Sequence, residues 1–186
     1  MSSLHFVTAN QNKYMESQLI LEQYGINIEL YSAVLTEIQS DSIELIAIEK
    51  AKSAFAEISK PVIVEDDGLF IYKLNGFPGQ YSSYVYKTIG NNGILKLLLN
   101  SQNRSAVFRS FFTFYDGKTK PESFKGETQG RISHRITQGG WGYDPIFIPT
   151  ESDLTFGQLQ IRNRKIDFSH RTNAINQFAK WYKQQH

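Results

Sequence analysis

The chain contains no cysteine, and this absence narrows the chemistry that it can perform. Without thiols it forms neither a disulfide framework nor a thiolate metal site, so oxygen or imidazole ligands must hold any bound metal ion. Carboxylates are therefore the candidate ligands for a hard cation such as Mg²⁺.

Long apolar runs and a one-sided charge are missing as well. No apolar run approaches the roughly 20 residues that span a bilayer, and the amino terminus lacks the basic and then apolar pattern of a signal peptide. The 20 basic and 18 acidic residues are mixed along the chain rather than clustered. We expect a cytoplasmic protein that binds neither membranes nor nucleic acid.

What is present predicts an α/β fold. The 186 residues, 40% of them hydrophobic, predict one domain over residues 1–186, without repeats or linkers. Hydrophobic periodicity and turn signals predict the following elements: a strand at 4–8, a helix ending near Tyr24, a strand at 26–31, a helix at 42–57 with an Asp41/Glu44 capping box, a strand at 62–64, a helix at 90–99, a hairpin of 106–115 with 122–133, and a final helix from Ser169. The expected fold is a mixed central sheet with flanking helices.

Lys50 interrupts the apolar face of the helix predicted at 42–57. One interpretation is that its ammonium extends along the core to reach solvent at the edge. The other is that the ammonium points into a functional site.

Positive charge also occupies two helix starts, at Lys13 and at the pair His170 and Arg171. The macrodipole disfavours cations there, but a helix amino terminus with nearby cations binds phosphate groups well. Lys13 is accordingly either a solvated surface lysine or part of a triphosphate site.

Three consecutive carboxylates, Glu65, Asp66 and Asp67, follow the apolar strand at 62–64. Alternation along an extended chain sends Asp66 to one face and its two neighbours to the other. The segment is either a solvated acidic turn or a magnesium site, since Mg²⁺ takes one or two protein carboxylates together with substrate phosphates.

Five short motifs, in order along the chain, resemble those of the inosine/xanthosine triphosphate pyrophosphatases, a family that removes non-standard purine nucleotides. They are T-A-N-Q-N-K at 8–13, E-D-D-G-L at 65–69, G-F-P-G-Q-Y-S at 76–82, G-G-W-G-Y-D-P-I-F at 139–147 and S-H-R at 169–171. The resemblance implies Mg²⁺-dependent hydrolysis of inosine, deoxyinosine and xanthosine triphosphates to the monophosphate and pyrophosphate. It also implies an elongated, two-lobed homodimer subunit with the active site in the cleft between lobes.

The resemblance assigns roles residue by residue. Asp66 corresponds to the catalytic carboxylate and a metal ligand, and Glu37 corresponds to the second metal ligand. The other matched positions are expected to bind the substrate: Thr8, Ala9, Asn10, Gln11, Asn12, Lys13, Lys50, Asp67, Trp141, Gly142, Tyr143, Asp144, Lys165, His170 and Arg171. Lys13, Lys50 and Lys165 are placed around the phosphates, and Trp141 against the base.

Base choice follows from donors and acceptors. Arg171 can only donate, and the 6-oxo group of hypoxanthine or xanthine can only accept, whereas adenine presents an amino group. Two departures from the family pattern are Asp67 in place of serine and Trp141 in place of phenylalanine.

Two alternatives remain open. One is a Maf-like pyrophosphatase that acts on modified pyrimidine nucleotides, and the other is a nucleotide sensor without turnover. Asp66 and Glu37 argue against the sensor, because a protein that only binds has no need of a hydrolytic carboxylate.

Overall fold

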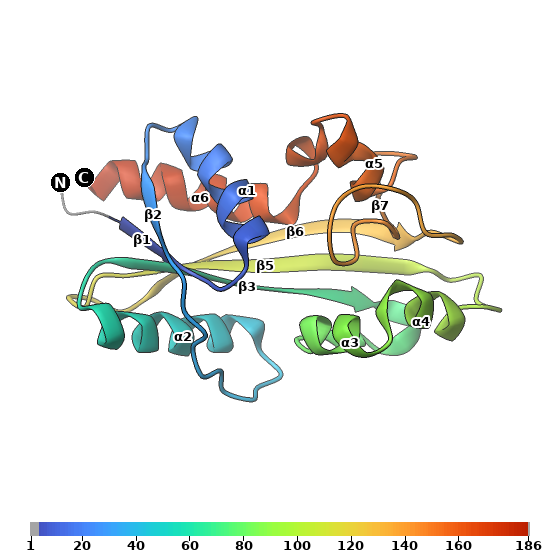
Figure 1. Ribbon diagram of the computed structural model, residues 1–186, viewed down its shortest axis with the longest axis horizontal. Helices are drawn as coiled ribbons and strands as arrows, with labels where there is room; N and C mark the ends of the chain where they lie inside the picture. The colour runs from blue at the N-terminus through green and yellow to red at the C-terminus, as the bar shows by residue number, and fades with distance from the viewer. Residues whose placement is uncertain (1–3, 186) are drawn as a thin grey trace. The chain divides into compact units, whose positions relative to one another are not determined.

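A mixed sheet with helices on both faces organises the chain, and the predicted α/β class is confirmed. The computed structural model describes residues 4–185 (Figure 1). The elements in order are β1 (Leu4–Val7), α1 (Gln11–Glu22), β2 (Ile28–Tyr31), α2 (Ile43–Ile58), β3 (Val62–Ile71), η1 (Tyr72–Leu74), β4 (Pro78–Gly79), α3 (Ser82–Thr88), α4 (Gly90–Leu97), β5 (Ser105–Tyr115), β6 (Glu122–Ile132), β7 (Phe147–Pro149), α5 (Phe156–Ile161), η2 (Lys165–Asp167) and α6 (His170–Gln185).

The sheet has seven strands in the order β2-β1-β3-β5-β6-β7, with β4 paired to β3. β1 runs parallel to both β2 and β3, while β3–β4 and β6–β7 are antiparallel pairs. The chain forms two compact units. Unit 1 holds the residues up to Asp66, then Ser110–Gly126, and those from Arg171 onward, and unit 2 holds Asp67–Arg109 and Glu127–His170.

In unit 1, α2 lies on one face of the strands, and α1 and α6 lie on the other (Figure 1). The α2 face is closed by small side chains, because Ala51 and Ala54 pack against Val62 and Val64. On the α6 face, Phe178 packs on Phe112 at 5.2 Å between ring centroids. In the part of β3 that belongs to unit 1, even-numbered residues therefore face α2 and odd-numbered ones face the other side, as the two-residue period of a strand requires.

Unit 2 has a core of its own. It is built from aromatic and aliphatic residues of β3, β5, α4, α5 and β7, including Leu69, Phe108, Ile94, Phe156 and Phe147. The ring of Phe108 meets that of Phe147 edge to face at 4.8 Å. These contacts hold α3 and α4 on one side of the strands and α5 on the other (Figure 1).

Two local expectations were wrong. The strand expected at 62–64 continues as β3 through the three carboxylates to Ile71, so they do not form a turn. The cap of α2 is Ser42, whose side chain accepts from the Leu45 amide, rather than Asp41. A serine one residue further along reaches the same helix end, and Ser, Asp and Asn are almost equally good caps.

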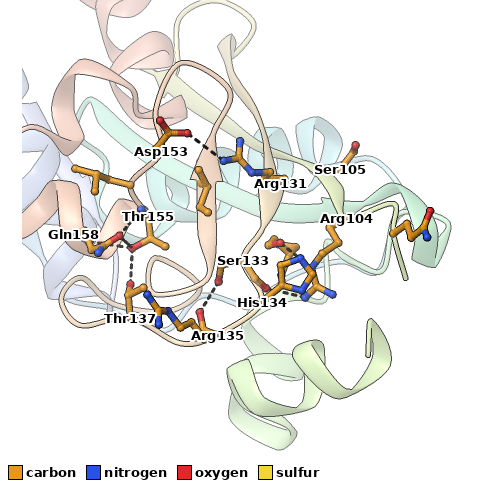
Figure 2. A pocket seen from close by; sticks show the side chains of 14 residues that line it. Arg104, Ser105, Arg131, Ser133, His134, Arg135, Thr137, Asp153, Thr155 and Gln158 are labelled. Atoms are coloured by element: carbon orange, nitrogen blue, oxygen red, sulfur yellow. Dashed lines mark hydrogen bonds and ion pairs between the residues drawn. The ribbon is translucent and has the colours of Figure 1, made fainter. Parts of the chain in front are cut away.

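Unit 2 also contains a cavity of about 530 Å³ (Figure 2). None of the predicted site residues lines it. Its only carboxylate, Asp153, has a fully exposed side chain and pairs with Arg131 at 3.5 Å. This cavity is therefore not the candidate active site.

None of the helices in the described part of the chain has the length and apolar character needed to cross a membrane.

Arg104, in the wall of that cavity, ties the end of α4 to β6. Its guanidinium donates to the carbonyl oxygens of Leu98, Ile132 and Ser133 at 2.7–2.9 Å. Burial of the group lowers the pKa of Arg104 from its usual value. Its three acceptors are main-chain carbonyl oxygens of two separate segments, so the residue is structural.

We expect Arg104→Ala to lower the free energy of unfolding by about 3 kcal/mol, because three main-chain carbonyl groups each lose the guanidinium as a hydrogen-bond donor. Urea unfolding of the two proteins measures the difference. Arg131→Ala is the matched control, since its exposed ion pair is worth less than about 1 kcal/mol. Equal losses in the two variants would contradict the structural role of Arg104.

Candidate functional site

The centre of the site in unit 1 is a lysine held between two carboxylates. The ammonium of Lys50 lies 3.0 Å from Asp66 Oδ1 and also contacts Glu37 Oε1. Lys50 comes from the middle of α2 and Asp66 from β3, while Glu37 lies in the irregular segment before α2. The side chains of Lys50 and Asp66 are 14% and 15% exposed, and that of Glu37 is 51% exposed. Lys50 thus points into a site rather than out to solvent.

Burial and neighbouring charges have opposing effects on the carboxyl group of Asp66. Burial raises the pKa of its carboxyl to about 6, with a further rise from Glu37, against the lowering effects of Lys50 and Lys13. Its second oxygen, Oδ2, is buried and has no hydrogen-bond partner among the described residues. A buried, unpaired carboxylate oxygen is costly. It is also a ligand that a hard divalent cation would accept, so the donor set fits Mg²⁺.

The first turn of α1 brings a second lysine, Lys13, to this site. Asn10 caps the helix, its side chain accepting from the amides of Asn12 at 3.0 Å and Lys13 at 3.3 Å, while Thr8 Oγ1 accepts from the Asn10 amide. Two amides of the helix start are therefore already bonded within the loop. The positive charge that this segment brings to the site is the ammonium of Lys13, which donates to the Glu65 carbonyl oxygen at 3.4 Å.

On the α6 face of β3 lies a separate charged cluster. The Arg171 guanidinium donates through Nε to Glu65 Oε2 at 2.8 Å and through Nη1 to Glu16. Ser110 donates to the other Glu65 oxygen at 2.7 Å. The Arg171 and Glu65 side chains are almost wholly buried. Two carboxylates thus fix the position of Arg171 and keep its charge in the interior.

Sequence reasoning missed Glu16 and Ser110. Glu16 lies three residues after Lys13 and therefore on the same side of α1, which is a usable signal. Ser110 is fully buried in β5 and looks like any small strand residue in the sequence. No residue pattern singles it out.

In unit 2, the glycine-rich loop at 139–142 is built on close backbone approaches. Gly139 and Gly140 have φ of +87° and +71°. A Cβ on Gly139 would lie 2.3 Å from the Gly157 carbonyl oxygen, and one on Gly140 would lie 2.4 Å from Asp144 Cβ. Only glycine fits both the conformation and the space.

Asp144 organises the end of this loop. Its Oδ2 accepts from the Trp141 amide at 3.1 Å and pairs with the Lys165 ammonium at 2.7 Å. Both charged side chains are more than nine-tenths buried. The Lys165 ammonium lies 5.2 Å from the centre of the Trp141 ring, a cation–π contact that orients the indole.

Neighbouring groups fix the rest of the loop. The Gly142 carbonyl oxygen accepts from the Asn91 side chain at 3.0 Å. The Tyr143 hydroxyl donates to the Ser82 carbonyl oxygen at 3.0 Å, and burial raises the pKa of Tyr143 above its usual value.

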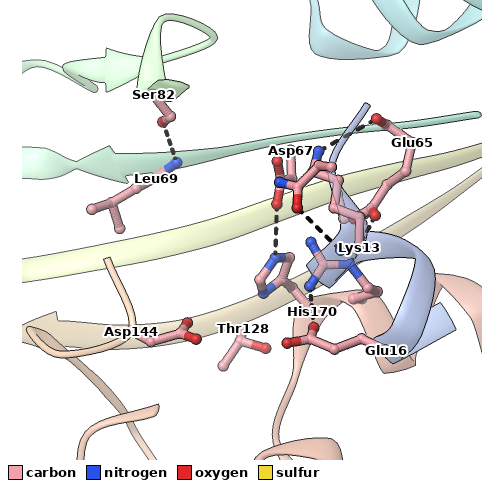
Figure 3. A network of polar contacts seen from close by, with 12 residues as sticks. Lys13, Glu16, Glu65, Asp67, Leu69, Ser82, Thr128, Asp144 and His170 are labelled. Atoms are coloured by element: carbon pink, nitrogen blue, oxygen red, sulfur yellow. Dashed lines mark hydrogen bonds and ion pairs between the residues drawn. The ribbon is translucent and has the colours of Figure 1, made fainter. Parts of the chain in front are cut away.

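Asp67 and His170 form the last pair in unit 2, with Asp67 Oδ2 3.6 Å from His170 Nε2 (Figure 3). The imidazole stacks on Phe108 at 4.6 Å with an interplanar angle of 6°. Stacking fixes the ring plane and leaves its nitrogens at the ring edge. Both side chains offer atoms that could bind a metal ion or a polar substrate group.

The structure thus gathers the predicted residues of each unit. In unit 1, Lys13, Lys50 and Glu37 all act on the carboxyl group of Asp66, since the two lysines lower its pKa and Glu37 raises it. In unit 2, Trp141, Asp144 and Lys165 are linked directly. Ala9, in the loop before α1, and Gln11, the first residue of α1, are both exposed. Unit 1 offers a carboxylate site for a divalent cation beside two ammonium groups, a set suited to a polyphosphate.

Comparison with known sequences gives one consistent result. A model of the Ham1 family matches residues 4–181. A protein of Methanopyrus kandleri named dITP/XTP pyrophosphatase is 49% identical over 179 residues, which cover 96% of this chain and 95% of that protein. A Thermococcus kodakarensis protein of the same name is 40% identical over 182 residues, 97% of each chain.

Solved structures agree in fold. The Staphylococcus aureus Ham1 protein superposes with a TM-score of 0.81 at 28% sequence identity, covering 98% of this chain and all of that one. A HAM1 protein from Coxiella burnetii gives a TM-score of 0.85 at 24% identity over 99% of this chain and all of that one.

The raised pKa of Asp66 makes stability depend on pH. Its folded pKa of about 6 exceeds the ordinary 3.8, so this group favours folding below pH 4, and that contribution is lost as the pH rises through 6. Keeping the carboxylate ionised in the fold costs about 3 kcal/mol. We therefore expect Asp66→Asn to be more stable than the parent by up to about 3 kcal/mol at pH 8, with little advantage near pH 4.

Urea midpoints measured with a chelator at several pH values between 4 and 8 test this expectation. Asp153→Asn, an identical change at an exposed carboxylate, is the control and should show no such trend. An advantage for Asp66→Asn that is independent of pH would contradict the prediction.

Proposed function

Because the chain belongs to the Ham1 family, we propose that it is a hydrolase that cleaves non-standard purine nucleoside triphosphates, with inosine, deoxyinosine and xanthosine triphosphates as substrates, to the monophosphate and pyrophosphate. The supporting relatives are named dITP/XTP pyrophosphatase and match over almost their whole length. The observation that carries the proposal is the meeting of Asp66, Glu37 and Lys50 in unit 1. A protein that only binds nucleotides gains nothing from a buried carboxylate of raised pKa.

The metal would be Mg²⁺, held by Asp66 and Glu37. When bound, it would neutralise phosphate charge and polarise the bond that breaks. The pKa of Asp66, about 6, lies close to neutral pH. A carboxylate with such a pKa is suited to accept a proton from the attacking water. Lys13 and Lys50 would donate to phosphate oxygens and stabilise the charge that develops on them.

Arg171 is the proposed reader of the base. Glu16 and Glu65 accept from Nη1 and Nε, so the guanidinium, whose N–H groups can only donate, is held in one orientation. A buried and fixed donor discriminates better than a mobile one, because a mismatched amino group at C6 would be left unpaired. The penalty of about 1–3 kcal/mol corresponds to roughly tenfold to over a hundredfold in selectivity.

The unit 2 residues are proposed substrate contacts too. Trp141, oriented by Lys165, presents a flat apolar face suited to stacking on a purine. Asp67 and His170 add polar groups at a fixed ring edge. We further propose that residues 1–186 work as one catalytic domain, that the enzyme is a homodimer, and that it is cytoplasmic.

The purified protein with Mg²⁺ should release pyrophosphate from inosine triphosphate at least tenfold faster than from adenosine triphosphate, since Arg171 can donate to a 6-oxo group but not pair with a 6-amino group. A coupled pyrophosphate assay over a panel of nucleotides measures this ratio. Equal rates would remove the base-reading role. Binding without turnover would favour the sensor, and a preference for modified pyrimidine nucleotides would favour a Maf-like activity.

Asp66→Asn should lower the turnover number by at least about a hundredfold, because an amide neither accepts the proton from water nor binds the metal ion as a carboxylate does. Circular dichroism should show an unchanged fold. Asp153→Asn serves again as the matched change and should keep the parent rate. Near-full activity of Asp66→Asn would refute its catalytic role.

A further inference from the structure

The ammonium of Lys50 occupies the position between Glu37 and Asp66 at which one cation can interact with both carboxylates. We propose that Lys50 is a built-in competitor of the divalent ion, and that metal binding displaces its ammonium and makes it available to the phosphates of the substrate. The inference rests on the proposed function, because it assumes that Glu37 and Asp66 are the metal ligands.

The contacts determine which oxygens are accessible. Lys50 donates to Asp66 Oδ1 and contacts Glu37 Oε1, so both of these atoms are engaged by an ammonium. Asp66 Oδ2 is buried without a hydrogen-bond partner among the residues described. A cation can approach Oδ2 without disturbing Lys50, but an ion that also binds Asp66 Oδ1 or Glu37 Oε1 competes with the ammonium for that oxygen.

Charge favours the exchange. One ammonium leaves a surplus negative charge on the two carboxylates, whereas a divalent ion neutralises both. The side chains also permit it, since lysine carries a compact charge on a flexible stem. Asp66 is held in β3, but Glu37 is half-exposed and lies in a segment without regular secondary structure, so its carboxylate has room to adjust.

The exchange would couple the two ligands of the enzyme. A divalent ion that frees Lys50 adds a donor for the phosphates, and phosphates that attract Lys50 leave the carboxylates to the ion. Such coupling is reciprocal and amounts to roughly 5- to 150-fold in affinity. Lys50 would then make the charge arrangement suited to hydrolysis depend on both ligands being bound.

Removing the competitor should therefore strengthen metal binding. We expect Lys50→Met to bind Mg²⁺ at least tenfold more tightly than the parent, measured by titration calorimetry without nucleotide. Lys52→Met is the control, because Lys52 lies on the same helix but contacts Glu49 instead, and its affinity should match the parent. Equal or weaker binding by Lys50→Met would overturn the inference.

The parent and Asp66→Asn distinguish this inference from the proposed metal site. If the parent binds Mg²⁺, Asp66→Asn does not, and Lys50→Met equals the parent, the site stands and the competition fails. If neither the parent nor Lys50→Met binds Mg²⁺, both fail. Tight binding that appears only in Lys50→Met supports both.

A measurement on the unaltered protein covers the case in which Lys50→Met does not fold. Reductive methylation followed by peptide mass spectrometry reports how readily each lysine reacts. Adding Mg²⁺ should increase the labelling rate of Lys50 severalfold, because its ammonium leaves the two carboxylates, while Lys52 stays unchanged. A Lys50 rate that does not respond to saturating Mg²⁺ would overturn the inference.

Discussion

The alternation of side chains between the two faces of β3 is the constraint on which the site in unit 1 depends. Because successive side chains leave a strand on opposite faces, Glu65 and Asp66 face different helices. Asp66 meets Lys50 of α2, and Glu65 meets Arg171 of α6. Adjacent carboxylates thus acquire different tasks, one toward a metal ion and the other toward a buried arginine. A shift of one residue in this strand would exchange them and bury both wrongly.

Much of this arrangement could be predicted from residue patterns. The alternation of Glu65 and Asp66 was predicted from strand geometry alone and is confirmed. The anomalous Lys50 was the strongest single signal, because a cation within an apolar helix face needs a partner, and the structure supplies two. The mixed sheet and the final helix were also predicted correctly, since their periodicities are long and regular. The resemblance to a family supplied what patterns could not, namely Glu37, which no local rule singles out.

Other features depend on tertiary contacts and could not be read in advance. The length of β3 was underestimated because consecutive carboxylates resemble a solvated turn. They are tolerated in the strand because Arg171 and Ser110, both distant in sequence, contact Glu65. The helix start at Lys13 was considered as part of a triphosphate site, yet the amides of Asn12 and Lys13 already donate to the Asn10 side chain. The link between Asp144 and Lys165 joins residues whose charges gave no hint of pairing.

The reciprocal contact of Gly139 and Gly157 limits how such a protein can be altered. A Cβ on either residue would lie within 2.4 Å of the other's carbonyl oxygen, so the loop that carries Trp141 rests on the backbone of α5 without intervening side chains. Neither position can vary alone, and neither can compensate for a change in the other. Base preference, in the laboratory or in evolution, can therefore change through the side chains that the loop carries. The glycine turn that positions those side chains has to stay the same.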